Sequence, residues 1–190
     1  MFSEEKVAQM AAYLLLKRGG RMAYLKLMKL LYLSNRRSIL ERGRMMGEDN
    51  LYSMPHGPVM SHTLDLIRQR NRAGGKYWFS LLQTEGTDLV LRRDPRTVDV
   101  DDVLDTLSRS DLKILDGVYA EFGHMNRFDL RDMTHLEKYC PEWRNPGSSR
   151  MPIDCKDILI YEGKSEEDAN NIIQNMRESE DLKEFNTHLI

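Results

Sequence analysis

The histidines and cysteines are the residues of this chain best suited to catalysis or metal binding. They include His56, His62, His124, His135, Cys140 and Cys155. Nucleophilic catalysis would need a thiol beside an imidazole, and Cys140 with His135 is one such pair, because partners of this kind meet in space and not in sequence. A zinc site would need closely paired ligands, a spacing that these residues do not show. We therefore expect no metal and no catalytic residue.

The common catalytic motifs are also missing from the sequence. It contains no glycine-rich phosphate loop of either usual type, no nucleophile elbow and no H-E-x-x-H. These absences weigh against nucleotide chemistry and against a bound cofactor. We expect a protein that is not an enzyme.

Charge is distributed unevenly along the chain, although its net value is only −2. Nine basic residues and one acid lie between Lys17 and Arg44, whereas eight acids and three bases lie between Glu162 and Ile190. Such asymmetry suits a polyanion-binding face, a partner of opposite charge, or two parts of one fold that attract each other. We favour the last interpretation.

The segment from Tyr24 to Arg42 predicts an apolar central helix that packs on several sides. Its basic residues fall on one narrow stripe, formed by Lys26, Lys29, Arg36 and Arg37. The stripe could contact phosphates or a protein partner, but a solvated edge, or one paired with the acidic C-terminal segment, is the simpler interpretation.

A second basic patch, "RQRNRAGGKYW", places Arg68, Arg70 and Arg72 close to Tyr77 and Trp78. Basic residues beside aromatic ones can bind phosphates and stack on bases. The sequence pI of about 6.2 is low for a dedicated nucleic-acid binder. We expect the aromatic residues to form one face of a β-hairpin on the core, and we do not expect nucleic acid as the partner.

The stretch "MPHGPV" holds His56 between two prolines and a glycine. Proline restricts both itself and the residue before it, so we expect a fixed loop. In one interpretation the loop is a structural plug, with His56 hydrogen-bonded to nearby backbone. In the other, Pro55 and His56 belong to a partner-binding face, where a rigid loop loses little entropy on binding.

The elements predict an α+β fold, a mainly helical single domain around the central helix with one small β-hairpin. We expect helices over about 3–17, 24–42 and 63–71, one capped by Ser108 with Asp111, a short one after Asn126, and two near the C-terminus. Two apolar runs around Glu85 and Gly86 predict the hairpin. The domain should span 1–178, and 179–190 should be a helical tail prone to fraying.

Sequence composition also predicts the cellular compartment of the protein. No apolar run approaches the roughly 18 to 20 residues that a membrane span needs, and the first residues do not resemble a secretory signal. Two cysteines in 190 residues form no disulfide framework, so we expect free thiols in a reducing compartment. We expect a cytoplasmic protein.

Three segments together resemble a known family. They are K-L-x-K-L-L-Y at Lys26 to Tyr32, M-P-H-G-P-V at Met54 to Val59, and the pair T-H and P-E-W at Thr134–His135 and Pro141–Trp143. With the segment between them, they are similar to the Panacea, or SocA-like, antitoxin domain of bacteria and their phages, over about Lys6 to Glu178. The resemblance implies a protein that neutralises a toxin by direct binding, and it implies no catalytic residue. The family pairs with unrelated toxins, so the toxin is not specified.

We accordingly expect an antitoxin that binds a cognate toxin, encoded by the adjacent gene, in a fixed ratio. The partner-binding candidates are Lys26, Lys29, Arg36, Arg37, Pro55, His56, Arg68, Arg70, Arg72 and Trp143. Trp143 would serve as an interface anchor, or as a lid over the core. Two alternatives are an adaptor that delivers a toxin to a protease through the acidic C-terminal helix, and a nucleic-acid-binding regulator. Some relatives carry a separate helix-turn-helix domain, which we do not expect here, so we do not expect autonomous promoter binding.

Overall fold

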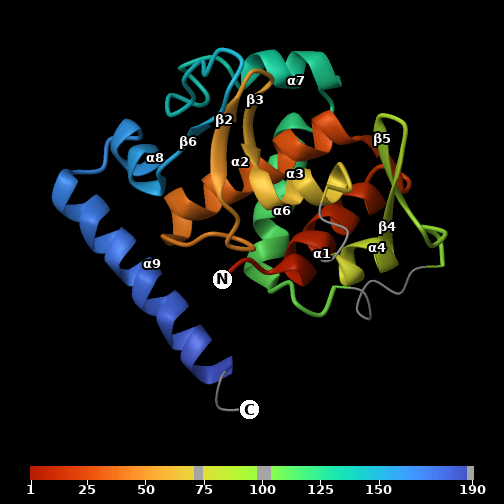
Figure 1. Ribbon diagram of the computed structural model, residues 1–190, viewed down its shortest axis with the longest axis horizontal. Coiled ribbons are helices and arrows are strands. Elements are labelled where there is room, and N and C mark those ends of the chain that lie inside the picture. The colour runs from red at the N-terminus through yellow and green to blue at the C-terminus, as the bar shows by residue number, and fades with distance from the viewer. Residues whose placement is uncertain (71–74, 98–103, 188–190) are drawn as a thin grey trace.

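The computed structural model describes residues 1–70, 75–97 and 104–187 (Figure 1). Helices surround one central helix, and two small antiparallel sheets, each of three strands, flank them. The expected α+β, mainly helical class is therefore confirmed. The expected boundary at residue 178 falls inside the last helix.

The central helix is α2 (Tyr24–Arg42), as the sequence predicts. Several of its apolar side chains, pointing to different sides of the helix, are completely buried, among them Leu27, Leu30, Leu31 and Ile39. Helix α2 contacts α1 (Glu4–Leu16), α6 (Arg109–Phe122), α7 (Arg127–Met133) and α8 (Cys155–Tyr161), which enclose it as Figure 1 shows. A helix buried on so many sides sets the positions of everything packed around it.

Side-chain caps begin several of these helices, including the Ser108 and Asn126 caps predicted above. The Ser3 side chain accepts from the Lys6 amide at the start of α1. Ser108 and Asp111 form a reciprocal capping box at the start of α6. Asn126 caps α7, and Ser165 accepts from the Asp168 amide at the start of α9 (Glu166–Thr187).

The first sheet contains the hairpin expected around Glu85 and Gly86. Strands β4 (Leu82–Glu85) and β5 (Asp88–Leu91) pair with each other, and β1 (Arg21–Ala23) pairs with β5. The residues before β4 differ from the prediction, because they form helix α4 (Lys76–Leu81). Tyr77 and Trp78 therefore lie on a helix and not on a hairpin face, and Trp78 is completely buried.

The second sheet corrects the interpretation of "MPHGPV" as a loop. Strands β2 (Leu51–Met54) and β3 (Gly57–Met60) form a hairpin, and Met54 pairs with Gly57 across a turn made by Pro55 and His56. The third strand, β6 (Met151–Pro152), comes from far along the chain. The two prolines do not interrupt this hairpin, because Pro55 lies in the turn and Pro58 is paired with Ser53 beside it.

Helix α3 (Ser61–Ile67) follows the second hairpin directly and ends earlier than the expected residue 71, which lies outside the described residues. A distant side chain caps it: Asp49 accepts from the amides of His62 and Thr63, each at 2.8 Å, and from the Thr63 hydroxyl at 2.6 Å. This carboxylate ties the loop before β2 to the start of α3.

The expected attraction between the basic and acidic segments is limited. Among the described residues, one ion pair joins segment 17–44 to segment 162–190, between Arg36 and Glu162. Both cysteines are free thiols, as expected. In the part of the chain that the structure describes, no helix combines the length and the apolar character needed to cross a membrane.

Candidate functional site

The three sequence segments singled out above meet around the β2–β3 hairpin. Lys29 of α2 donates from Nζ to the Pro58 carbonyl at 2.8 Å. Trp143 donates from Nε1 to the Met54 carbonyl at 3.1 Å, and the Arg144 amide donates to Ser53 Oγ at 3.2 Å. The helix on one side and the P-E-W segment on the other thus fix the backbone of the hairpin.

Gly57 is the position where this packing is tightest. Its φ of +87° belongs to the left-handed region, which favours glycine. A Cβ atom at this residue would lie 2.7 Å from Thr134 Oγ1 and 2.8 Å from Lys29 Nζ. The hairpin can therefore approach α2 this closely only with glycine at its turn.

The two lysines of the central helix serve the interior of the fold. Lys29 is completely buried, and burial lowers the pKa of its amine to about 7. Lys26 is also buried and donates from Nζ to the Gly123 carbonyl at 2.6 Å and to the Met125 carbonyl. Burial lowers the pKa of Lys26 as well. Neither amine is presented to solvent.

Carboxylates pair with the remaining residues of the basic stripe, in a buried network for Arg36 and near the surface for Arg37. Tyr32 donates to Glu142 Oε1 at 2.6 Å, and Arg36 Nε donates to the same oxygen at 3.0 Å. Arg36 is also paired with Glu162, and Arg37 with Glu121. The interpretation of an exposed basic stripe is thus wrong for Lys26, Lys29 and Arg36, because the pattern of charges on a helix does not show which backbone carbonyls and carboxylates will surround it.

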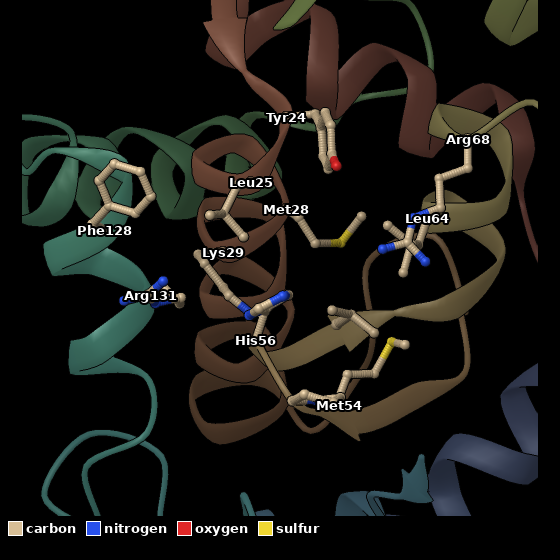
Figure 2. A pocket seen from close by; sticks show the side chains of 12 residues that line it. Tyr24, Leu25, Met28, Lys29, Met54, His56, Leu64, Arg68, Phe128 and Arg131 are labelled. Carbon is tan, nitrogen blue, oxygen red and sulfur yellow. The ribbon is translucent and has the colours of Figure 1, made fainter. Parts of the chain in front are cut away.

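Beside this hairpin lies an open pocket, which we call the hairpin pocket. Helix α2, the hairpin, α3 and α7 form its walls (Figure 2). It is lined by Tyr24, Leu25, Met28, Lys29, Met54, Pro55, His56, Val59, Leu64, Arg68, Phe128 and Arg131. Its interior is apolar, and its volume is about 250 Å³.

The polar side chains that line the hairpin pocket are basic or neutral, and none of its lining residues is an acid. Arg68 is exposed and makes no ion pair within the described part of the chain. Arg131 is paired with Asp132 at 2.6 Å, so part of its charge is neutralised. Phe128, 49 % exposed, lies under the Arg127 and Arg131 guanidinium groups at 4.8 and 5.5 Å. The pocket therefore combines an apolar floor with a cationic rim.

Four of the ten predicted partner-binding residues meet in this pocket. They are Lys29, Pro55, His56 and Arg68. Pro55 and His56 are exposed at the turn, so the interpretation of His56 as a structural plug bonded to backbone is wrong. It failed because the prolines order the backbone of the turn and leave the side chain of His56 outside.

The other predicted residues lie elsewhere. Arg37 faces a more polar hollow beside Glu121, and Arg70 is exposed near Asp65, 4.0 Å away. Trp143 is half-buried and forms an edge-to-face contact with His135, with ring centroids 4.3 Å apart, as a lid over the core would. Arg72 lies outside the described residues.

Several residues that line the pocket are not among the predicted partner-binding residues, notably Tyr24, Met28, Phe128 and Arg131. Met28 looked like an ordinary member of the apolar arc of α2, and Tyr24 like the first residue of that helix. Phe128 carried a weak signal, since an aromatic residue between Arg127 and Arg131 at the start of a short polar helix has no obvious place in a core. Only the packing of α7 beside α2 brings these residues to the hairpin.

The geometry gives little support for a thiol nucleophile, a metal site or stacking of Trp78 on a base. Burial raises the pKa of the Cys140 thiol to about 12, so it is protonated near neutral pH and is a poor nucleophile. No group of three or more potential metal-ligating residues occurs within 1–70, 75–97 and 104–187. Trp78 is buried in the core and cannot stack on a base.

Comparison with known proteins agrees with the resemblance seen in the sequence. The family model described as "Antitoxin SocA-like, Panacea domain" matches residues 27–144, which run from α2 through the hairpin to Trp143. A search of curated proteins and a search of solved structures found no match. The matched part contains all the residues that line the hairpin pocket except Tyr24 and Leu25, and it covers more than half of the chain. The chain therefore belongs to the SocA-like antitoxin family, defined by the Panacea domain.

Proposed function

We propose that this protein is an antitoxin that neutralises a cognate protein toxin by direct binding in a fixed ratio, without a catalytic step of its own. The observation that carries the proposal is the hairpin pocket, an open apolar surface with a cationic rim that the family-matched segments build. The toxin would place a side chain in this pocket.

The size of the pocket favours a protein over a small molecule as its ligand. Sites for small molecules usually measure about 300 to 1,000 Å³. The hairpin pocket, at about 250 Å³, is smaller and suits one or two side chains of a partner. Its rim includes an exposed aromatic residue, Phe128, and an exposed arginine, Arg68, which are residue types enriched at protein interfaces.

The fixed geometry of the hairpin supports the same proposal. Lys29, Trp143 and Arg144 hold the backbone of β2 and β3 through side-chain and amide hydrogen bonds. A surface that is already ordered loses little conformational entropy when a partner binds. Bound there, the antitoxin would cover the toxin's active site or substrate-binding surface.

The structure also indicates which basic groups could steer a toxin toward the pocket by electrostatic attraction. Lys26, Lys29 and Arg36 are buried, so they contribute little to the attraction of a distant partner. Arg68 is the exposed cation that we expect to accelerate association with an acidic toxin surface. Reversal of its charge should lower the association rate, and the effect should shrink as the salt concentration rises.

Growth of a bacterial culture tests the proposed function. The open reading frame adjacent to this gene is induced alone and together with this protein, and the products are purified through a tag on one of them. We expect the neighbour alone to stop growth, co-expression to restore it, and the two proteins to purify in a constant ratio. A harmless neighbour, or rescue without any complex, would contradict direct neutralisation by this pair.

A further inference from the structure

Helix α9 (Glu166–Thr187) forms an arm that leads away from the rest of the molecule. It packs on α8 near its start, and its far end lies apart from the other elements in Figure 1. Ala169 is completely buried, while Ile172, Ile173 and Met176 are half-buried on the side that faces the body. These apolar residues account for the attachment of the arm, and they all lie in its first half.

The second half of the arm carries apolar residues on the opposite side. Leu182 and Phe185 are 63 % and 64 % exposed. With Glu178 and Asp181, also exposed, they occupy positions i, i+3, i+4 and i+7, so the four side chains share one face of the helix. This is the spacing with which a helix anchors itself in a groove of a partner. The face, which we call the arm tip, joins two carboxylates to two large apolar groups.

The hairpin pocket has the complementary chemistry. Its floor is apolar, its lining includes no acid, and Arg68 on its rim makes no ion pair within the described part of the chain. Leu182 and Phe185 would occupy the floor while Glu178 and Asp181 approach Arg68 and the other basic groups of the rim. The acidic and apolar groups of the arm tip thus match the basic rim and the apolar floor of the hairpin pocket.

We infer that the arm tip of one copy docks in the hairpin pocket of a second copy, so that the protein associates with itself through α9. In a two-fold symmetric dimer the contact is made twice, once by each arm. The inference does not depend on the proposed function. If both are correct, the second copy and the toxin compete for one pocket, and the self-associated form is a reserve that the toxin dissociates.

Sedimentation equilibrium of five full-length proteins, the unmodified protein and four variants, tests this inference. The arm variant is Leu182→Ala with Phe185→Ala, and the pocket variant is Arg68→Glu. Two controls match them: Leu136→Ala removes another exposed leucine, 54 % exposed, and Arg70→Glu reverses an exposed arginine near the pocket that does not line it. All substituted residues are exposed, so we expect the fold to survive, which circular dichroism would verify.

We expect the unmodified protein to dimerise with a dissociation constant in the micromolar range, and the arm and pocket variants to dimerise roughly thirtyfold more weakly, the loss typical of an interface hot spot. Both controls should match the unmodified protein. A mixture of the arm variant and the pocket variant should associate more tightly than either variant alone and less tightly than the unmodified protein. The reason is that a mixed dimer contains one intact arm tip and one intact pocket.

Three results would overturn the inference. The first is an unmodified protein that stays monomeric up to about 300 μM, far above a micromolar constant. The second is a pocket variant that dimerises normally, because the arm would then contact something other than the pocket. The third is equal weakening by Arg70→Glu, which would reveal a general effect of charge. None of these results bears on the toxin-binding test, which measures a complex of two different proteins.

Discussion

At the scale of single residues, the basic and acidic groups of the family-matched segments divide into structural and exposed sets. Glu142 accepts hydrogen bonds from Tyr32 and Arg36 in the interior. Arg37 and Glu121 form a similar pair near the surface, where the Glu121 side chain is 52 % exposed. The contribution of each pair to stability depends on its burial. When one partner of a buried pair is removed, the other charge stays buried without compensation, whereas water solvates the remaining charge of an exposed pair.

Replacement of Glu142 by alanine should lower the free energy of unfolding by about 3 kcal/mol, because Arg36 loses its main buried partner. Replacement of Glu121 by alanine is the matched control, and it should cost less than about 1 kcal/mol because its pair is exposed. Urea denaturation measures both values. Equal losses would show that the Glu142 network does not stabilise the fold as its burial implies.

The buried amine of Lys29 should make stability depend on pH. The folded protein releases this proton near pH 7, because burial lowers the pKa, whereas the unfolded chain holds it to about pH 10. Between pH 7 and about 8.5 the unfolded state thus binds more protons, so stability rises with pH, by roughly 1.5 kcal/mol over this range. The range ends at about pH 8.5 because this is the ordinary pKa of cysteine. Above it, thiols of the unfolded chain lose protons that the buried Cys140 thiol keeps, so this group makes stability fall as pH rises.

Lys29→Met provides the comparison for this pH dependence. Urea denaturation at pH 7.0 and 8.5 should show a clear gain of stability for the unmodified protein and a much smaller gain for the variant, which has no group to titrate at this position. A variant with the same gain as the unmodified protein would show that other groups cause the dependence.

At the scale of elements, the β2–β3 hairpin depends on one glycine for its approach to α2. Gly57 and Gly86 both lie in hairpin turns with positive φ, at +87° and +60°. They differ in their surroundings: a Cβ at Gly57 would meet Thr134 and Lys29, whereas nothing lies within 4 Å of one at Gly86. A substitution at Gly86 therefore measures the cost of the backbone conformation alone, whereas one at Gly57 adds the cost of the steric clash.

Gly86→Ala should destabilise the protein by about 1 kcal/mol, the usual cost of a left-handed conformation for a residue with a Cβ. Gly57→Ala should cost clearly more, because the hairpin must also move away from α2. Thermal or urea denaturation compares the two variants. A loss at Gly57 no larger than that at Gly86 would contradict the tight packing described for this turn.

Elements with a strong local signal could be predicted from the sequence, and those that depend on distant partners could not. The range of α2 followed from its apolar arc, and the start of α6 from Ser108 and Asp111. Strands β2 and β3 were missed because two prolines argued for a loop, and because β6, which completes their sheet, lies about a hundred residues away. Helix α4 was mistaken for a strand, since its six residues are too few to show a helical period.

At the scale of the whole molecule, the hairpin pocket exists only because α2, α3, α7 and the hairpin converge. The sequence identified Pro55, His56 and Arg68 as candidates, but it could not show that Lys26 and Arg36 turn inward or that Phe128 joins the rim. Charge patterns specify residue types on a helix, whereas exposure depends on which elements pack beside it. Family membership indicates the antitoxin role in general, and the pocket suggests where a toxin would bind.

The measurement that tests the central claim most directly is the dissociation constant of the antitoxin–toxin complex for a matched pair of variants. Phe128→Ala removes the exposed aromatic group at the hairpin pocket, and Leu136→Ala removes an apolar group of similar exposure outside it, at 49 % and 54 %. Calorimetric titration should show binding roughly thirtyfold weaker for Phe128→Ala, a loss typical of an interface hot spot, and unchanged for Leu136→Ala. Full affinity of the Phe128→Ala variant would contradict the account and place the toxin on another surface.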